Sequence, residues 1–323
     1  MWKKRNTKMS NLELLSDQGL RLDGRRPNEL RHIKCKLGVF EQHDGSAYLE
    51  QGNTKVLAAV YGPHQAHSKR VDFNEVVINC QYSMATFSTA ERKKRPRGDR
   101  KSQEITLYLR QSLKAAIRTE LYPRSQIDVY VEVLQADGAN YAVALNAATL
   151  ALVDAGICLK EFVIACTASL SKNNVPLMDV SHFEEVSGGP TLTVASLPLS
   201  NKIAFMEMSQ RFHLEHLPKV LEHALNGCRK IKAVMEKAVR KHLMQMGSVG
   251  DWTTPEGKWT ILTAESVVFT CCPPAPLERL VSIFNSFSNK RIAISAGLGI
   301  TATEAVLVCT RPYFSVVGTL CTR

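Results

Sequence analysis

The sequence predicts a domain of the α+β or α/β class, in which several short strands alternate with a few long helices. Short runs of β-branched and aromatic residues recur along the chain and are typical of strands. Two other segments repeat apolar residues at helical spacing, which indicates helices that pack on a sheet. Sheets interleaved with a few such helices are typical of this class.

The expected elements follow one another through the first 250 residues. Asp-Gly and Gly-Asn turns separate the early strands. From Ser102, the stripe Ile105, Leu109, Leu113 has the i, i+4 spacing of a helix. Further helices are expected over Tyr141–Ala155 and Leu217–Met244. Strands are expected at Gly38–Phe40, Ser46–Gln51, Val56–Tyr61, Val76–Tyr82, Ile127–Leu134, Phe162–Leu170, Thr191–Leu197 and Lys202–Met208.

The composition excludes a wholly disordered chain and indicates the kind of partner that the protein binds. With 323 residues and 45% hydrophobic residues, the chain can fill one large domain or two small ones and is not wholly disordered. A net charge of +11 favours an acidic partner, with nucleic acid first and a membrane surface second. We expect neither a secretory signal nor a transmembrane helix. Nine cysteines without a regular framework indicate reduced thiols and no zinc site.

The polar turn Gln135–Asn140 lies between an expected strand and an Ala-rich apolar segment. A strand, a tight turn and a helix start together aim backbone N–H groups at an anion, so the turn is a candidate phosphate site. An ordinary buried helix after a turn is the alternative.

The segment Glu91–Lys101 holds seven positive side chains in eleven residues and contains Pro96 and Gly98. Such a segment is a solvated loop, a localisation signal or a surface that contacts nucleic acid. No pattern for base stacking accompanies it, so phosphate contacts without sequence preference are expected.

Several blocks in one order resemble the RNase PH family of phosphorolytic ribonucleases, over about Met9–Trp252. They are the turn at Gln135–Asn140, LELLSDQGLRLDGRR (Leu12–Arg26), DGSAYLEQGNTKVLAAVYGP (Asp44–Pro63) and NCQYSMATFSTAERKKRPRGDRKS (Asn79–Ser102). The resemblance implies an RNase PH-like fold, with mixed β-sheets flanked by helices, that packs into a six-membered ring. Within the family, the animal exosome ring subunits are the most similar.

Two motifs of the phosphorolytic members are altered here. Their phosphate loop reads Asp-Gly-Gly-Thr/Ser-Arg, whereas this chain has Asp137, Gly138, Ala139, Asn140 and Tyr141. Tyrosine cannot replace the bidentate fork of arginine.

Their paired aspartates, taken to bind a metal and to act as acid and base, correspond to Val186 and Leu192. Losing one electrostatic stabiliser costs about 10²–10³ in rate. We therefore expect a catalytically inactive pseudo-enzyme, with no catalytic residue, no metal and no cofactor.

The resemblance also implies an RNA path. Lys69 and Arg70 fall where relatives line the narrow neck of the ring channel, and Arg100 and Lys101 where relatives contact RNA or phosphate. The complete set of predicted RNA-binding residues is Lys69, Arg70, Arg92, Lys93, Lys94, Arg95, Arg97, Arg100 and Lys101.

The function expected from these features is that of a non-catalytic ring subunit of the RNA exosome, which guides single-stranded RNA to associated 3′→5′ exoribonucleases. Implied partners are other RNase PH-like subunits, the nearest resembling exosome component 9, together with S1/KH cap subunits and a hydrolytic exoribonuclease, in the nucleus, nucleolus and cytoplasm. The first alternative is an active phosphate-dependent 3′→5′ exoribonuclease that uses Asp179, Glu185 and Asn140. The second is a free RNA-binding protein.

The two ends depart from the family pattern. Residues 1–8 are expected to be a short basic extension and residues 9–252 the RNase PH-like domain. Residues 253–323 carry no motif that we recognise, and they are a real appended segment or the product of atypical splicing or of a gene model. Strand-like runs occur in this part at Ser266–Thr270 and Ala305–Thr310.

Overall fold

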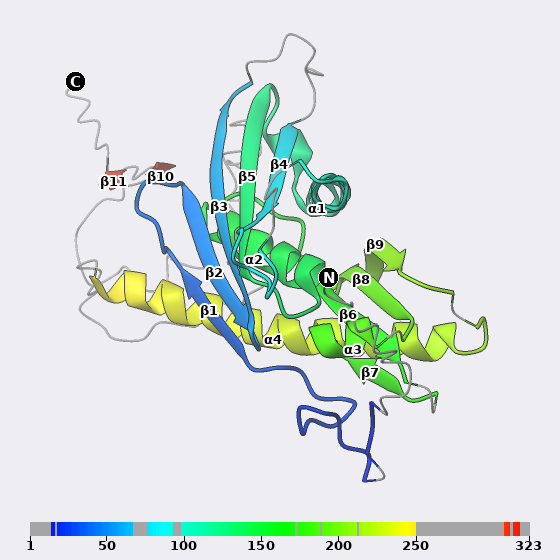
Figure 1. Ribbon diagram of the computed structural model, residues 1–323. Coiled ribbons are helices and arrows are strands. Elements are labelled where there is room, and N and C mark those ends of the chain that lie inside the picture. The colour runs from blue at the N-terminus through cyan, green and yellow to red at the C-terminus, as the bar shows by residue number, and fades with distance from the viewer. Residues whose placement is uncertain are drawn as a thin grey trace, which may run out of the picture. The chain divides into compact units, whose positions relative to one another are not determined.

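The computed structural model describes residues 14–16, 18–66, 76–92, 98–171, 174–187, 189–211, 213–249, 307–310 and 313–316 (Figure 1). The chain divides into two compact units, Met1–Val268 and Phe269–Arg323. In the second unit, strands β10 (Leu307–Thr310) and β11 (Tyr313–Val316) form an antiparallel pair. The expected strand at Ser266–Thr270 lies outside the described residues.

The first unit contains a five-stranded and a four-stranded sheet. The five-stranded sheet has the order β1-β2-β3-β5-β4, in which only β4 and β5 run parallel. Its strands are β1 (Ile33–Leu37), β2 (Gly45–Gln51), β3 (Thr54–Gln65), β4 (Val77–Met84) and β5 (Ser125–Gln135). The other sheet is antiparallel and has the order β7-β6-β8-β9, with β6 (Ile164–Leu170), β7 (Pro176–Met178), β8 (Thr191–Leu197) and β9 (Lys202–Met208).

Four α-helices and one short 3₁₀ helix accompany these sheets among the described residues. They are α1 (Arg100–Ala116), η1 (Thr119–Leu121), α2 (Asn140–Asp154), α3 (His182–Val186) and α4 (Leu217–Val249). Helix α2 packs against β2, β3 and β5 on one side and against β6 on the other. Helix α4 contacts β6, β7 and β8, and it runs beside the four-stranded sheet in Figure 1.

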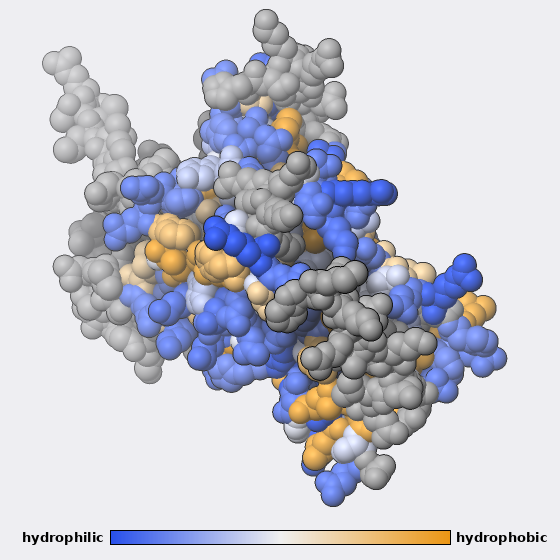
Figure 2. All heavy atoms as spheres, in the orientation of Figure 1, coloured by the Kyte–Doolittle hydropathy of each residue, from blue (hydrophilic) through white to orange (hydrophobic). Residues whose placement is uncertain are grey.

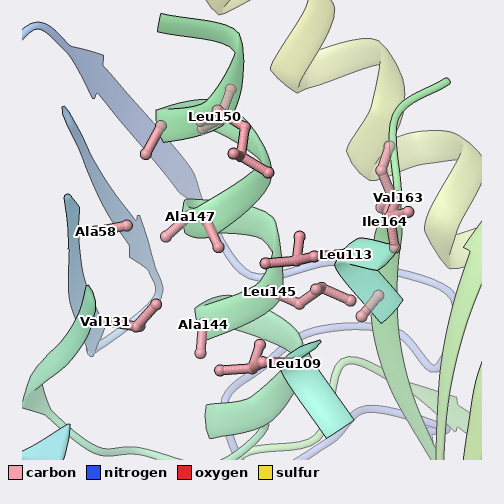
Figure 3. Close-up of a cluster of buried hydrophobic side chains, with 14 of the residues drawn as sticks. Ala58, Leu109, Leu113, Val131, Ala144, Leu145, Ala147, Leu150, Val163 and Ile164 are labelled. Atoms are coloured by element: carbon pink, nitrogen blue, oxygen red, sulfur yellow. The ribbon is translucent and has the colours of Figure 1, made fainter. Parts of the chain in front are cut away.

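The main core lies around α2. This helix is apolar all round, and its residues from Tyr141 to Leu152 are all buried, as expected for a helix enclosed by other elements. Figure 3 shows Ala58 and Val131 of the sheet facing α2, and Leu109 and Leu113 of α1 beside Leu145. This packing fixes the position of the loop that precedes α2.

Most expected elements are confirmed, and β8 and β9 match their expected bounds. The expected strand Gly38–Phe40 is wrong, because the strand before β2 ends at Leu37. Four elements of the first unit, β1, η1, β7 and α3, were not expected.

The described surface on one face is mainly hydrophilic, with separate hydrophobic patches (Figure 2). No described helix combines the length and the apolar character that a membrane span requires.

Candidate functional site

The loop between β5 and α2 is a tight turn with a strained backbone. Gly138 has φ +80°, and Ala139 has φ +51° in the left-handed region. A Cβ atom at Gly138 would lie 2.5 Å from the backbone nitrogen of His182, so only glycine fits there. The turn brings the chain into α2 at Asn140, where the first backbone N–H groups of a helix have no partner within it. The expected order of strand, tight turn and helix start is thus present, and anion binding at this loop stays a prediction.

Neighbouring segments hold this loop in place. The Thr54 hydroxyl accepts a hydrogen bond from the Asp137 N–H group (3.2 Å) and donates one to the Gly138 carbonyl (3.0 Å). The N–H group of His182 donates to the Asp137 carbonyl (3.1 Å). The fold therefore places the phosphate-loop residues against α3, although Asp137 and His182 are 45 residues apart in the chain.

Arg31 connects the loop to the strand end at Asp179. Its Nη2 atom lies 2.7 Å from Asp179 Oδ1, and its Nη1 atom donates to the Asp137 carbonyl at 2.8 Å. Burial alone would raise the pKa of Asp179, but attraction and hydrogen bonds from Arg31 outweigh it and hold that pKa below its ordinary value. Asp179 is fully buried, and its carboxylate is engaged in this ion pair, which gives it a structural role.

A second buried ion pair fixes α3. Arg21 contacts both carboxylate oxygens of Glu184, and both side chains are buried. Glu184 also accepts from the Ser181 N–H group at 2.9 Å, which completes a capping box at the start of α3. Of the two adjacent glutamates, only Glu185 is exposed.

Tyr141 is a core residue. Its side chain is 7% exposed, and its hydroxyl lies 2.7 Å from the Ser112 hydroxyl on α1. The ring packs edge to face with Tyr108 (centroid distance 6.3 Å) and Phe205 (5.3 Å). Burial raises the pKa of Tyr141, so the residue stays neutral. This hydroxyl is held against α1 and is not directed to the loop.

Val186 and Leu192 occupy the positions of the expected aspartates and differ in their exposure to solvent. Val186 ends α3 and is 55% exposed. Leu192 is fully buried and packs with Val220 and Ala224 of α4. Because successive side chains of a strand point to opposite faces, it is Thr191 that lies on the sheet face directed toward α2. Leu192 is therefore a core position and not part of an acidic site.

The predicted RNA-binding residues are only partly described. Arg92, Arg100 and Lys101 are exposed. Lys69, Arg70, Lys93, Lys94, Arg95 and Arg97 lie outside the described residues. Asp99 caps α1 by accepting from the Arg100 N–H group, and Arg100 pairs with Glu104 at 3.2 Å. Helical spacing places Lys101 on the face of α1 that carries Tyr108 and Ser112, which is the face toward Tyr141.

Sequence reasoning missed three charged groups, of which Arg31 contacts the loop itself. Arg21 and Arg31 gave no local signal, because their partners are more than 140 residues away. The third is Glu207 on β9, whose pKa is raised by partial burial and by Glu104. It lies close enough to contribute to the raised pKa of Tyr141. Among the described residues, no three His, Cys, Asp or Glu side chains gather as metal ligands.

Comparison with known proteins assigns the family. Residues 29–158 match domain 1 of the 3′ exoribonuclease family (RNase PH), and residues 161–227 match domain 2. The chain belongs to this 3′ exoribonuclease family. The predicted RNase PH-like fold, with its mixed sheets and helices, is thereby confirmed.

Individual relatives are also similar. The chain is 56% identical over 239 residues to exosome complex component RRP41 of Bos taurus, a match that covers 73% of this chain and 97% of that protein. It is 39% identical over 231 residues to exosome complex component Rrp41 of Methanopyrus kandleri, covering 71% and 95%. The crystal structure of rice (Oryza sativa) Rrp46 matches with a TM-score of 0.60 and 25% identity, over 67% of this chain and 98% of that chain.

The prediction of a catalytically inactive pseudo-enzyme is wrong. Both domains match a family of 3′ exoribonucleases, and the relatives from Bos taurus and Methanopyrus kandleri are both Rrp41 components. The inference failed because it treated Tyr141 and Leu192 as site positions, whereas both side chains belong to the core. The identity of two core residues therefore gives no information about which side chains face the candidate phosphate loop.

Proposed function

We propose that this chain is a ring subunit of an RNA exosome and that, in the assembled ring, it takes part in phosphate-dependent 3′→5′ shortening of single-stranded RNA. The match to both domains of the 3′ exoribonuclease family supports the activity. The similarity to RRP41, at 56% identity over nearly all of that protein, supports the assembly and a subunit of the exosome component 4 type.

The loop before α2 is the observation that carries the proposed chemistry. Backbone N–H groups at the start of α2 would hold inorganic phosphate, together with the side chain of Asn140. Asn140 Oδ1 is buried and has no hydrogen-bond partner among the described residues, so the amide is available to reorient toward a ligand. An oxygen of the bound phosphate would attack the terminal phosphodiester phosphorus, the 3′ oxygen would leave, and a nucleoside diphosphate would be released.

Arg31 at the loop is paired with Asp179, and we propose that further positive charge for the phosphate and the RNA comes from α1. The arginine of the family's phosphate loop is absent, and the start of α1 supplies Arg100 and Lys101 on its exposed surface. Lys101 lies on the face of α1 toward Tyr141, so its ammonium group is placed to attract phosphate or an RNA backbone. We propose that Arg92 and the predicted basic residues outside the described ranges extend this charge along the RNA path.

The proposed assembly has several members. We propose contacts with other RNase PH-like subunits, the nearest of them resembling exosome component 9, and with S1/KH cap subunits and a hydrolytic exoribonuclease. We place the assembly in the nucleus, nucleolus and cytoplasm. The similarity to exosome components supports partners of the exosome ring, and the individual partners and locations stay predictions.

Co-expression tests the assembly. The full chain would be produced with candidate RNase PH-like subunits, and native mass spectrometry would give the composition of the particle. A heteromeric ring that protects single-stranded RNA from nuclease digestion is the expected result. A chain that stays monomeric with every candidate, or a ring that does not protect RNA, would contradict the proposal.

A further inference from the structure

A cavity opens on the face of the five-stranded sheet that is turned away from α2. Strand alternation places Tyr61 and Tyr130 on this outer face, while Val60 and Val129 are buried on the α2 side. Tyr61 lies opposite Asp128 in the register of β3 and β5. The cavity has a volume of about 710 Å³ and is lined by His43, Asp44, Tyr61, Gly62, Pro63, His64, Asp128 and Tyr130.

Aromatic rings form one wall of the cavity. The ring centroids of His43 and Tyr61 are 4.6 Å apart, and those of Tyr61 and Tyr130 are 5.7 Å apart. The Tyr61 hydroxyl is hydrogen-bonded to His43 Nε2 at 3.0 Å, which fixes the two rings relative to each other. Tyr61 is 38% exposed and Tyr130 is 41% exposed, so part of each side chain is accessible to a ligand.

Two carboxylates complete the cavity. Asp44 Oδ2 accepts from the N–H group of Gly62 at 2.8 Å. Asp128 Oδ1 accepts from the side-chain amides of Asn79 (3.0 Å) and Gln126 (2.9 Å), and Asp128 Oδ2 lies 3.5 Å from His64 Nε2. The two side-chain amides that donate to Asp128 are neutral, so they fix its carboxylate without cancelling its charge. This acidic, aromatic site stands out in a chain with a net charge of +11.

We propose that this cavity receives an arginine side chain of a partner protein. A guanidinium group stacks on aromatic rings and donates to carboxylates at the same time, and it does so with a planar geometry that lysine lacks. Two fixed carboxylates repel the phosphates of RNA, so the charge of the cavity favours a protein over a nucleic acid. The inference does not depend on the proposed exoribonuclease activity.

A neighbouring hollow indicates that the arginine belongs to a protein surface and not to a free amino acid. This hollow, of about 280 Å³, shares Tyr130 with the cavity, and its lining includes Phe40, Leu57 and Leu134 on the same face of the sheet. A partner that inserts an arginine would therefore also cover apolar side chains next to it, which provides a hydrophobic contribution to binding.

Nuclear magnetic resonance with labelled tyrosine rings tests the chemistry in the full chain. The probes are N-acetyl-arginine amide and the corresponding citrulline amide, which has nearly the same shape and no charge. We expect saturable shifts of the Tyr61 and Tyr130 signals with the arginine probe and clearly weaker binding of the citrulline probe. Asp128→Asn and, separately, Tyr61→Leu should each weaken binding of the arginine probe by about three- to fivefold. The control Phe87→Leu changes an exposed aromatic residue outside the cavity and should have no effect.

The outcomes that overturn the proposal are equal binding of both probes, or no shift of the two tyrosines in the wild-type chain. Cross-linking then tests the partner. With p-benzoylphenylalanine at position 130 of the full chain in its purified complex, the expected product joins this site to a peptide of another protein that contains arginine. Cross-links to RNA alone, to a second copy of this chain alone, or to peptides without arginine would show that the cavity has another occupant.

Discussion

Arg31 and Asp179 form a buried ion pair, with Nη2 and Oδ1 2.7 Å apart, although 148 residues separate them along the chain. Arg31 also donates to the carbonyl of Asp137 in the loop before α2. The pair thus joins the segment before β1 to the end of β7 and to the candidate phosphate loop. The geometry of that loop depends on a charge pair far from it in sequence.

Breaking this pair should destabilise the fold. Asp179→Ala leaves the guanidinium group of Arg31 buried without its carboxylate partner, and we expect a loss of about 3–5 kcal/mol in the free energy of unfolding. Urea unfolding at pH 7 measures it. The control Glu236→Gln removes an i, i+4 pair with Lys232 at 3.4 Å on α4 and should cost no more than about 0.5 kcal/mol. Equal losses for the two variants would contradict this role of the pair.

The same carboxylate predicts a pH dependence. The pKa of Asp179 in the folded chain lies below its ordinary value of about 3.9, since attraction to Arg31 exceeds the effect of burial. The unfolded chain therefore binds this proton first as the pH falls. The stabilisation is fully present above about pH 4 and is lost as the pH falls through the folded-state pKa. The difference in unfolding free energy between wild type and Asp179→Asn should hence be constant near neutral pH and shrink in acid, and a difference that grows in acid would refute the assignment.

Leu192 should behave as a core residue. Leu192→Asp buries a carboxylate against Val220 and Ala224, so we expect a loss of more than about 3 kcal/mol and no gain of phosphate-dependent RNA shortening. Leu192→Met conserves volume and should cost less than about 1.5 kcal/mol. A stable Leu192→Asp variant with increased nucleoside diphosphate release would show that this position faces the site after all.

Lys101 should contribute to RNA binding through charge alone. Lys101→Ala should weaken binding of single-stranded RNA equally for different sequences and lower the slope of log affinity against log salt by about 0.7. Fluorescence anisotropy of the assembled ring over a range of salt concentrations measures both quantities. The matched control is Lys114→Ala in the last turn of α1. A sequence-dependent loss, or an unchanged slope, would exclude a phosphate contact at Lys101.

The regular elements could be predicted where the side-chain period is clear. Strands β8 and β9 have the expected bounds, and α2 was recognised from its apolar run. Strand β1 was missed although lysines alternate with its apolar residues along Ile33–Leu37, which is the period of a half-buried strand.

The candidate site was harder to predict because long-range contacts build it. The turn at Asp137 and Gly138 was identified from local sequence, but its partners Thr54, Arg31 and His182 lie on distant segments. Motif spacing alone assigned Leu192 to an acidic pair. The polar and apolar residues that alternate from Thr191 to Val194 place Leu192 on the opposite face, a signal that the sequence contained.

The most direct test of the central claim is a phosphate titration of RNA shortening by the purified ring. Product analysis would separate nucleoside diphosphates from monophosphates for the wild type, for Asn140→Asp and for the control Asn140→Ala. We predict diphosphate release that saturates with phosphate. We also predict a higher KM for phosphate in Asn140→Asp, because this substitution puts a negative charge at the start of α2 that repels the anion. The control should retain most of the backbone cradle and change less. Monophosphate release that is independent of phosphate, or a wild-type ring that binds RNA and releases no diphosphate, would contradict the account.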